Sequence, residues 1–177
     1  MTHAIRFHAT GGPEVLRWEG VEVAPPGPGE ALVRHTAVGV NFIDTYHRTG
    51  LYPLPMPSGL GMEAAGVVEA VGEGVSEVRA GQRVAYACQP VGAYAEARTI
   101  RADRLVPLPA GVDDRTAAAV MLKGMTAQYL LRSTFRVEPG HVVLIHAAAG
   151  GVGLLACQWA RHLGATVIGT VSTEAKA

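Results

Sequence analysis

Residues 142–164, VVLIHAAAGGVGLLACQWARHLG, decide how the carboxyl-terminal part of the chain folds. The run HVVLIHA, which begins at position 141, is short, apolar and rich in β-branched residues, as is typical of a fully buried strand. GVGLLACQWARHLG has the composition of a helix that ends at Gly164, and ATVIGTV indicates a second buried strand. This order predicts a β-α-β unit with glycine residues at its first turn.

The glycine-rich turn has the spacing Ala148-x-Gly150-x-x-Gly153. A dinucleotide-binding turn needs glycine where the chain bends, where the backbone meets a pyrophosphate, and where the helix packs on the strand. Alanine at the first position departs from that pattern, but the turn opens a helix whose N–H groups favour an anion. We expect a dinucleotide here; the alternative is close helix packing without a ligand. The expected cofactor-binding residues of the turn are Ala149, Gly150, Gly151, Val152 and Gly153.

The choice of cofactor depends on the end of the second strand, where an acidic residue would bind the ribose 2'-hydroxyl of NADH. The chain has Val171, Ser172 and Thr173 there, with Lys176 nearby. Ser172 and Lys176 are suited to a 2'-phosphate, so we expect NADPH rather than NADH. A small shift of register would bring Glu174 into play, and Lys176 is alternatively an ordinary solvated lysine.

The first half of the chain, to about residue 110, consists of short β-branched runs separated by turn residues such as APPGPGE and VGEG. These runs predict many short strands in a barrel or sandwich. In NFIDTYHRTG, Asn41 or Asp44 is placed to start a short helical turn that ends at Gly50. From Asp113 the sequence becomes helical, and Gly124 is expected to divide this part into two helices.

Composition excludes several classes of protein. The chain of 177 residues has 15 basic and 15 acidic residues, so its net charge favours neither nucleic acid nor an anionic membrane. Cys88 and Cys157 lack the spacing of a disulfide scaffold or a zinc site, which indicates a reducing, cytoplasmic setting. The first residues do not resemble a secretory signal. The uncharged run 142–160 contains three glycines, His146 and Gln158, which argues against a membrane span.

Three segments carry a resemblance to a known family: VGVNFIDTYHRTGLYP at 38–53, LKGMTAQYLL at 122–131 and HAAAGGVGLLACQWARHLGA at 146–165. Their order resembles the medium-chain dehydrogenase/reductase superfamily, and most closely its zinc-free NADPH:quinone oxidoreductases, relatives of zeta-crystallin. The resemblance implies an α/β chain with a GroES-like β-barrel domain at 1–122. The amino-terminal part of a Rossmann domain would follow at 123–177. We expect the chain to be truncated and inactive alone, and the full-length protein to be a homodimer.

The zinc-dependent members of this superfamily use a cysteine after the third barrel strand and the histidine of a G-H-E motif. Here the first segment reads VGVNFIDTY, and the second position reads Gly61-Met62-Glu63, so both ligands are replaced. A thioether and an amide are poor ligands for zinc, and we expect no catalytic metal. A quinone is already a strong hydride acceptor and needs mainly positioning and a hydrogen bond, which favours quinone reduction.

The resemblance also implies roles for individual residues. Asn41 would lie at the nicotinamide, and Tyr46 and Tyr52 would line the substrate site as hydrogen-bond donors; the alternative for both tyrosines is packing within the β domain. Lys123 and Thr126 match a segment beside the nicotinamide, although Lys123 is alternatively a surface charge. Two other functions stay open: reduction of α,β-unsaturated aldehydes or ketones with NADPH, and a non-catalytic, crystallin-like nucleotide-binding protein.

Overall fold

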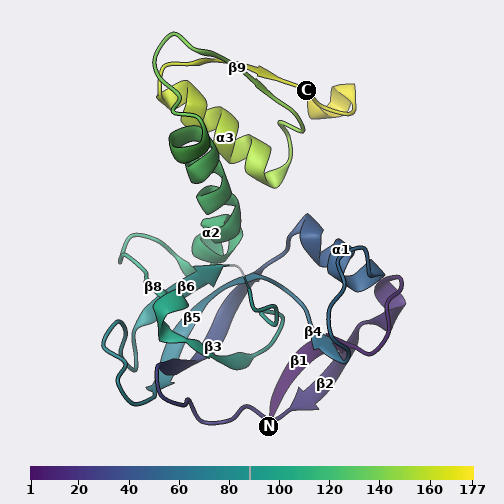
Figure 1. Cartoon of the computed structure of the whole chain (residues 1–177), viewed down its shortest axis with the longest axis vertical. Coiled ribbons are helices and arrows are strands. Elements are labelled where there is room, and N and C mark those ends of the chain that lie inside the picture. Colours follow the sequence, from purple (N-terminus) through teal and green to yellow (C-terminus); the bar gives the residue numbers. More distant parts are fainter. Residues whose placement is uncertain (88) are drawn as a thin grey trace. The chain divides into compact units, whose positions relative to one another are not determined.

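A computed structural model describes residues 1–87 and 89–177, so Cys88 lies outside the described residues. The chain forms two compact units, Met1–Met121 and Leu122–Ala177 (Figure 1). The helix α2, Asp114–Tyr129, contains the division between them and continues as a π-helical turn over Leu130–Thr134. No helix in the described part of the chain is long and apolar enough to cross a membrane.

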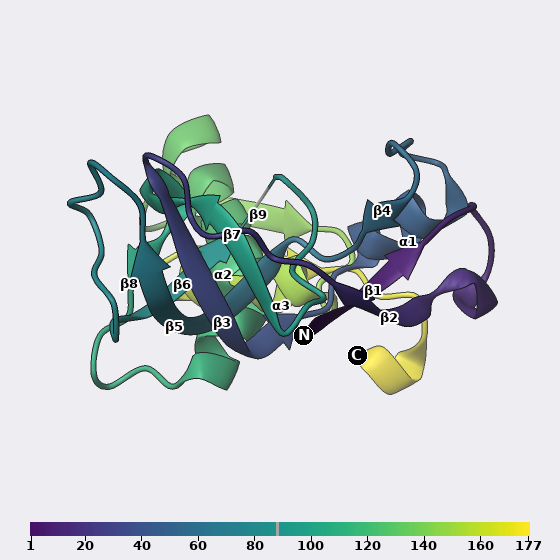
Figure 2. The ribbon, with the colours of Figure 1, turned by 90° about the horizontal axis from the view of Figure 1, so that it is seen from below.

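The first unit contains two antiparallel sheets (Figure 2). The three-stranded sheet has the order β2 (Arg17–Val21), β1 (Thr2–Phe7) and β4 (Ser58–Gly59). The five-stranded sheet has the order β7 (Ala97–Arg101), β3 (Glu30–Gly39), β5 (Glu63–Val71), β6 (Arg83–Ala87) and β8 (Val106–Pro107). The prediction of many short strands is confirmed, but β2, β4 and β8 were not anticipated because their sequences show no alternation.

Among the described residues, the two sheets are not joined into one continuous ladder, so this β unit is not a closed barrel. Their seam has one isolated bridge, between Ala4 and Ala95, beside a hydrogen bond from the Ile5 N–H to the Tyr94 carbonyl. Glu96 lies between the two sheets: its N–H donates to the His3 carbonyl of β1 at 2.9 Å, and its carbonyl accepts from the His35 N–H of β3. The seam is therefore too short to form a paired strand.

The main core of this unit lies on one face of the five-stranded sheet. Alternating side chains of β3 and β5 point into this core. Val33 and Val68 are buried there in one cluster with Val84 and Tyr86 of β6. A second, smaller core forms where Ala117 and Ala118 of α2 pack against the sheet. These contacts hold the first turns of α2 on the β domain.

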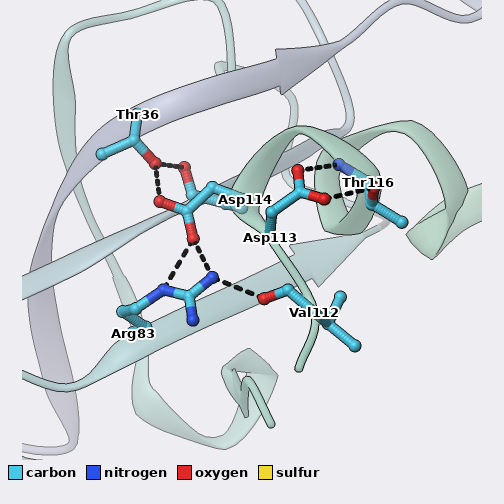
Figure 3. A network of polar contacts seen from close by, with 7 residues as sticks. Thr36, Arg83, Val112, Asp113, Asp114 and Thr116 are labelled. Carbon is cyan, nitrogen blue, oxygen red and sulfur yellow. Dashed lines mark hydrogen bonds and ion pairs between the residues drawn. The ribbon is translucent and has the colours of Figure 1, made fainter. Parts of the chain in front are cut away.

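The start of α2 is held by polar contacts that the sequence did not indicate (Figure 3). Asp113 caps the helix by accepting from the Thr116 N–H at 2.9 Å. Asp114 accepts from Arg83 Nε at 2.8 Å and from the Thr36 hydroxyl at 2.6 Å. Strands β3 and β6 are thus tied to the first turn of the helix.

Gly124 does not divide α2, contrary to the prediction. A lone glycine costs a helix only about 1 kcal/mol, which tertiary packing easily offsets. Helical residues on both sides of Gly124 are buried: Ala118 in the first unit, and Ala127 with Leu131 in the second. The packed turns on either side therefore keep the helix continuous.

The second unit is the predicted β-α-β arrangement. β9 (Val142–Ile145) and β10 (Thr166–Gly169) are parallel, with Val142 opposite Thr166, and α3 (Gly151–His162) connects them. Gly164 ends the connection with φ +86°, as expected for a left-handed helix end. The prediction of fully buried strands is wrong here: Val142 and Leu144 are 67% and 56% exposed, because α3 covers only the opposite face of β9.

Candidate functional site

Asn41 occupies the position from which helix α1 (Phe42–Thr49) begins, as predicted. Its backbone N–H donates to Asp44 Oδ2 at 2.9 Å, which is the carboxylate half of a capping box. Gly50 ends the helix with φ +84°. Asn41 is 9% exposed and Asp44 is 3% exposed, so both polar side chains are held inside the first unit. Asp44 is therefore a helix cap, one of the roles the sequence suggested.

The side-chain amide of Asn41 faces a buried carboxylate. Asn41 Nδ2 donates to Glu63 Oε1 at 2.8 Å, and Glu63 is fully buried at the start of β5. Gly39 makes room for this contact, because a Cβ atom at that position would lie 2.3 Å from the same Glu63 oxygen. The structure therefore pairs Asn41 with Glu63, a contact that sequence reasoning missed. The sequence did contain one signal for this contact: Glu63 is a single carboxylate at the start of the otherwise apolar run EAAGVV.

Tyr94 completes this polar cluster. Its hydroxyl donates to Asp44 Oδ2 at 2.8 Å, and its ring lies against Gly61, where a Cβ atom would lie 2.2 Å from the ring. Gly61 also has φ +90°, so glycine is required there for two reasons. Burial, and then the hydrogen bond to Asp44, raise the pKa of Tyr94 well above its usual value. The phenol therefore stays protonated and remains a donor.

Tyr46 and Tyr52 lie together at the surface of the same region. Their rings meet edge to face with centroids 5.3 Å apart, and Phe42 contacts Tyr46 in the same way at 5.2 Å. Tyr52 is 49% exposed and Phe42 is 74% exposed. The two predicted tyrosines thus form one aromatic surface beside Asn41 on α1, with Phe42 as an additional member.

Within residues 1–87 and 89–177, no group of three or more His, Cys, Asp or Glu side chains is arranged to hold a metal ion. Met62 and Glu63, at the position where related enzymes carry a zinc ligand, are both buried. The cluster around Asn41 instead consists of hydrogen bonds between protein groups.

In the second unit the glycine turn joins β9 to α3 as predicted. Gly150 caps the helix in an extended conformation, and a Cβ atom on Gly153 would lie 2.3 Å from the Ala147 carbonyl oxygen. Ala147 itself has φ +52°, which makes the bend tight without a first glycine. The first N–H groups of α3 lie at this turn, and the N-terminus of a helix is a place that favours an anion.

Lys123 packs over this turn, because a Cβ atom on Gly151 would lie 2.8 Å from Lys123 Cδ. Lys123 thus places a positive charge near the N-terminus of α3. The Thr126 hydroxyl donates to the Leu122 carbonyl at 2.8 Å. The Thr126 hydroxyl is therefore bonded within the helix.

Ser172 and Lys176, the two residues predicted to bind the 2'-phosphate, lie together after β10. Lys176 Nζ donates to Ser172 Oγ at 3.2 Å, and both side chains are exposed. The ends of β9 and β10 are joined beside them by a hydrogen bond between His146 Nδ1 and Thr170 Oγ1 at 2.9 Å. Glu174 is exposed and heads the last helical turn, Glu174–Lys176.

Comparisons with known proteins agree with this arrangement. The family model of the alcohol dehydrogenase GroES-like domain matches residues 27–110. A quinone oxidoreductase of Pseudomonas aeruginosa is 57% identical over 178 residues, covering 100% of this chain and 55% of that protein. A 2-haloacrylate reductase of a Burkholderia species is 54% identical over 183 residues, again covering 100% of this chain and 55% of the relative.

Among solved structures, the Escherichia coli quinone oxidoreductase complexed with NADPH is similar with a TM-score of 0.96 and 53% identity. The match covers 100% of this chain and 54% of that one. The chain thus spans about half the length of the curated relatives it matches.

The match of the GroES-like family model and the parallel β-α-β unit with its glycine turn agree with the medium-chain dehydrogenase/reductase architecture that the sequence resembles. Over its whole length, the chain is similar to proteins named quinone oxidoreductase.

Proposed function

We propose that the protein to which this chain belongs is an NADPH-dependent quinone reductase that transfers hydride without a metal. The observation that carries the proposal is the turn before α3, where Gly153 allows the close approach of backbone and Lys123 packs over Gly151. This arrangement suits a pyrophosphate. The Escherichia coli relative complexed with NADPH supports the same assignment.

NADPH is favoured over NADH by the contact between Lys176 and Ser172. Together they offer a positive charge and a hydroxyl to a 2'-phosphate, while no carboxylate stands at 171–173. When bound, the cofactor supplies the hydride. The chain's own residues then bind and orient: the turn holds the pyrophosphate, and Ser172 with Lys176 hold the 2'-phosphate.

On the substrate side, Tyr46 and Tyr52 are the donors proposed for the quinone. Reduction of a quinone to a hydroquinone takes one hydride and one proton, and the negative charge develops on a carbonyl oxygen. A phenol that donates to this oxygen stabilises the charge as it forms. The aromatic rings of Phe42 and the two tyrosines offer a flat, apolar surface of the kind a quinone ring packs on.

A second candidate is reduction of an activated alkene, which the 54% identical 2-haloacrylate reductase favours. It uses the same hydride but delivers it to carbon, so the proton must be added at the neighbouring carbon. The proposal further includes a cytoplasmic homodimer for the full-length protein, with no nucleic-acid or membrane partner.

The test is NADPH and NADH oxidation by the protein expressed from its whole reading frame, with benzoquinone and a 2-alkenal offered in parallel. We expect turnover with NADPH and quinone, and a loss of the preference for NADPH in Lys176→Ala. Faster reduction of the alkenal would select the second candidate, whereas NADPH binding without oxidation would indicate a non-catalytic protein. Unchanged preference for NADPH in the variant would remove Lys176 from the 2'-phosphate site.

A further inference from the structure

The buried side of α1 carries two polar atoms that no described protein group satisfies. Asp44 and His47 are each 3% exposed, and Asp44 Oδ1 and His47 Nδ1 have no hydrogen-bond partner among the described residues. Buried polar atoms in folded proteins are nearly always hydrogen-bonded, because an unpaired one loses its contact with water without compensation. The two atoms together therefore point to a bound group.

The spacing of the two residues along α1 brings their side chains to the same side of the helix. Residues three positions apart on a helix have Cβ atoms about 5–6 Å apart. Asp44 Oδ1 and His47 Nδ1 are not bonded to each other. One water molecule joins polar atoms that lie about 4–5.5 Å apart, since each of its hydrogen bonds is about 2.8 Å long. The spacing along the helix is therefore that of a bridge through one water.

The neighbouring polar atoms already have partners. Asp44 Oδ2 accepts from the Asn41 N–H at 2.9 Å and from the Tyr94 hydroxyl at 2.8 Å. The Asp44 N–H is bonded to Asn41 within the capping box, and the His47 carbonyl accepts from the Gly50 N–H at 3.2 Å. These groups are therefore not competitors for a molecule bound by Asp44 Oδ1 and His47 Nδ1.

The chemistry of the two atoms selects water as the ligand. An ionised carboxylate only accepts hydrogen bonds, so the bound group must donate to Asp44 Oδ1. An imidazole nitrogen donates or accepts according to its tautomer. A divalent metal ion needs more ligands, and the described residues hold no group of three or more His, Cys, Asp or Glu side chains arranged for one. Water both donates and accepts, and it satisfies both atoms.

We propose that one buried water molecule joins His47 to Asp44 beneath α1. His47 Nδ1–H donates to the water, and the water donates to Asp44 Oδ1. In this order each donor points toward the negative charge, and the two hydrogen bonds strengthen one another. The bridge also fixes the His47 ring, which meets the Tyr52 ring at an angle with centroids 6.3 Å apart. The site binds no cofactor and is independent of the proposed function.

NMR of the ¹⁵N-labelled 177-residue chain tests the bridge without any added ligand. Long-range ¹H–¹⁵N correlations at neutral pH show which ring nitrogen of each histidine carries the proton. A nuclear Overhauser cross-peak at the water frequency shows a water bound beside that proton. We expect the His47 proton on Nδ1, with a cross-peak to water. His35 is the matched control in the same spectrum, because its Nδ1 lies 2.7 Å from the Ala95 carbonyl, and its proton should show no such cross-peak.

Asp44→Asn tests the charge at the end of the bridge. The substitution keeps the size of the side chain, and asparagine starts helices as well as aspartate does. The ratio of the Nδ1–H form of His47 to the Nε2–H form should fall by about tenfold, the effect of losing one charge-assisted hydrogen bond. Asp113→Asn is the matched control, because Asp113 caps α2 instead, and it should leave the ratio unchanged.

A wild-type His47 with its proton on Nε2, or an Nδ1–H signal without the cross-peak to water, would overturn the bridge. An unchanged ratio in a folded Asp44→Asn variant would do the same. Spectra recorded in sodium, potassium and ammonium buffers separate water from a monovalent cation. Identical His47 signals in the three buffers support water, whereas signals that depend on the cation would place an ion at the site and refute the proposal.

Discussion

At the scale of single residues, His35 shows how a buried histidine is kept neutral. Its Nδ1 lies 2.7 Å from the Ala95 carbonyl, which can only accept, so this nitrogen carries the proton and Nε2 accepts from the Tyr86 hydroxyl. Burial lowers the pKa of His35 to about 4, and the nearby Arg98 charge adds to this, while the Ala95 contact opposes it. Burial likewise raises the pKa of Tyr86 to about 12, so the hydroxyl stays a donor.

This histidine predicts a loss of stability at acid pH. The unfolded state binds a proton near pH 6.5 and the folded state only near pH 4, so stability is complete above the first value and falls between the two. The loss should approach about 1.4 kcal/mol for each pH unit in that window. Urea unfolding of the wild-type chain and of His35→Gln from pH 7.5 to 4.5 measures it. Parallel pH profiles for the two proteins would contradict the assignment.

At the scale of elements, the first turn of α2 depends on one carboxylate rather than on its neighbour. Asp114 joins the helix to β3 and β6, and the Thr36 hydrogen bond, followed by the Arg83 contact, lowers the pKa of Asp114. Asp113 instead serves as a local cap through Thr116. The two aspartates are adjacent in sequence, but Asp114 joins the helix to the sheet, whereas Asp113 bonds only within the first turn of the helix.

Asp114→Asn should therefore destabilise the chain by about 2 kcal/mol, because it removes the charge that Arg83 is paired with. Asp113→Asn is the matched control and should change stability by less than about 0.5 kcal/mol, since asparagine caps helices as well as aspartate. Urea denaturation at pH 7 gives both values. Equal effects of the two substitutions would show that the link between helix and sheet contributes little.

At the scale of the whole molecule, the two units differ in how much core they have. The first unit is organised around a five-stranded sheet, whereas the second has only the two strands β9 and β10, packed against α3 and the end of α2. On the side of β9 lies an apolar hollow of about 440 Å³ lined by residues that include Leu131, Val143 and Ala156. A two-stranded sheet with one covered face is marginal by itself.

We expect the amide hydrogens of β9 and β10 in the 177-residue chain to exchange faster than those of β3 and β5. Hydrogen-exchange mass spectrometry at neutral pH measures both sets in one sample. The protein expressed from its whole reading frame serves as a comparison. Equal protection of the two units in the shorter chain would contradict the expectation that the second unit opens on its own.

Local patterns in the sequence were sufficient to predict the β-α-β unit, the start of α1 at Asn41 and the helix end at Gly164. Helix caps and left-handed glycines act over a few residues, and therefore their signals lie in adjacent positions. The same signals failed at Gly124, where packing of the turns on either side outweighs the propensity of one residue. The exposed faces of β9 and β10 were also missed, because an apolar run does not show what covers it.

The cluster around Asn41 depends on contacts between distant parts of the chain. Glu63 reaches Asn41 because β3 and β5 pair with Gly39 opposite Glu63, in a register that shifts twice along the pair, once in each strand. Tyr94 reaches Asp44 across 50 positions because its loop is bonded to Leu60 and Gly61. The sequence gives the identities of these residues, but which of them contact one another depends on the register of the strands. A change of register by one residue would change every contact.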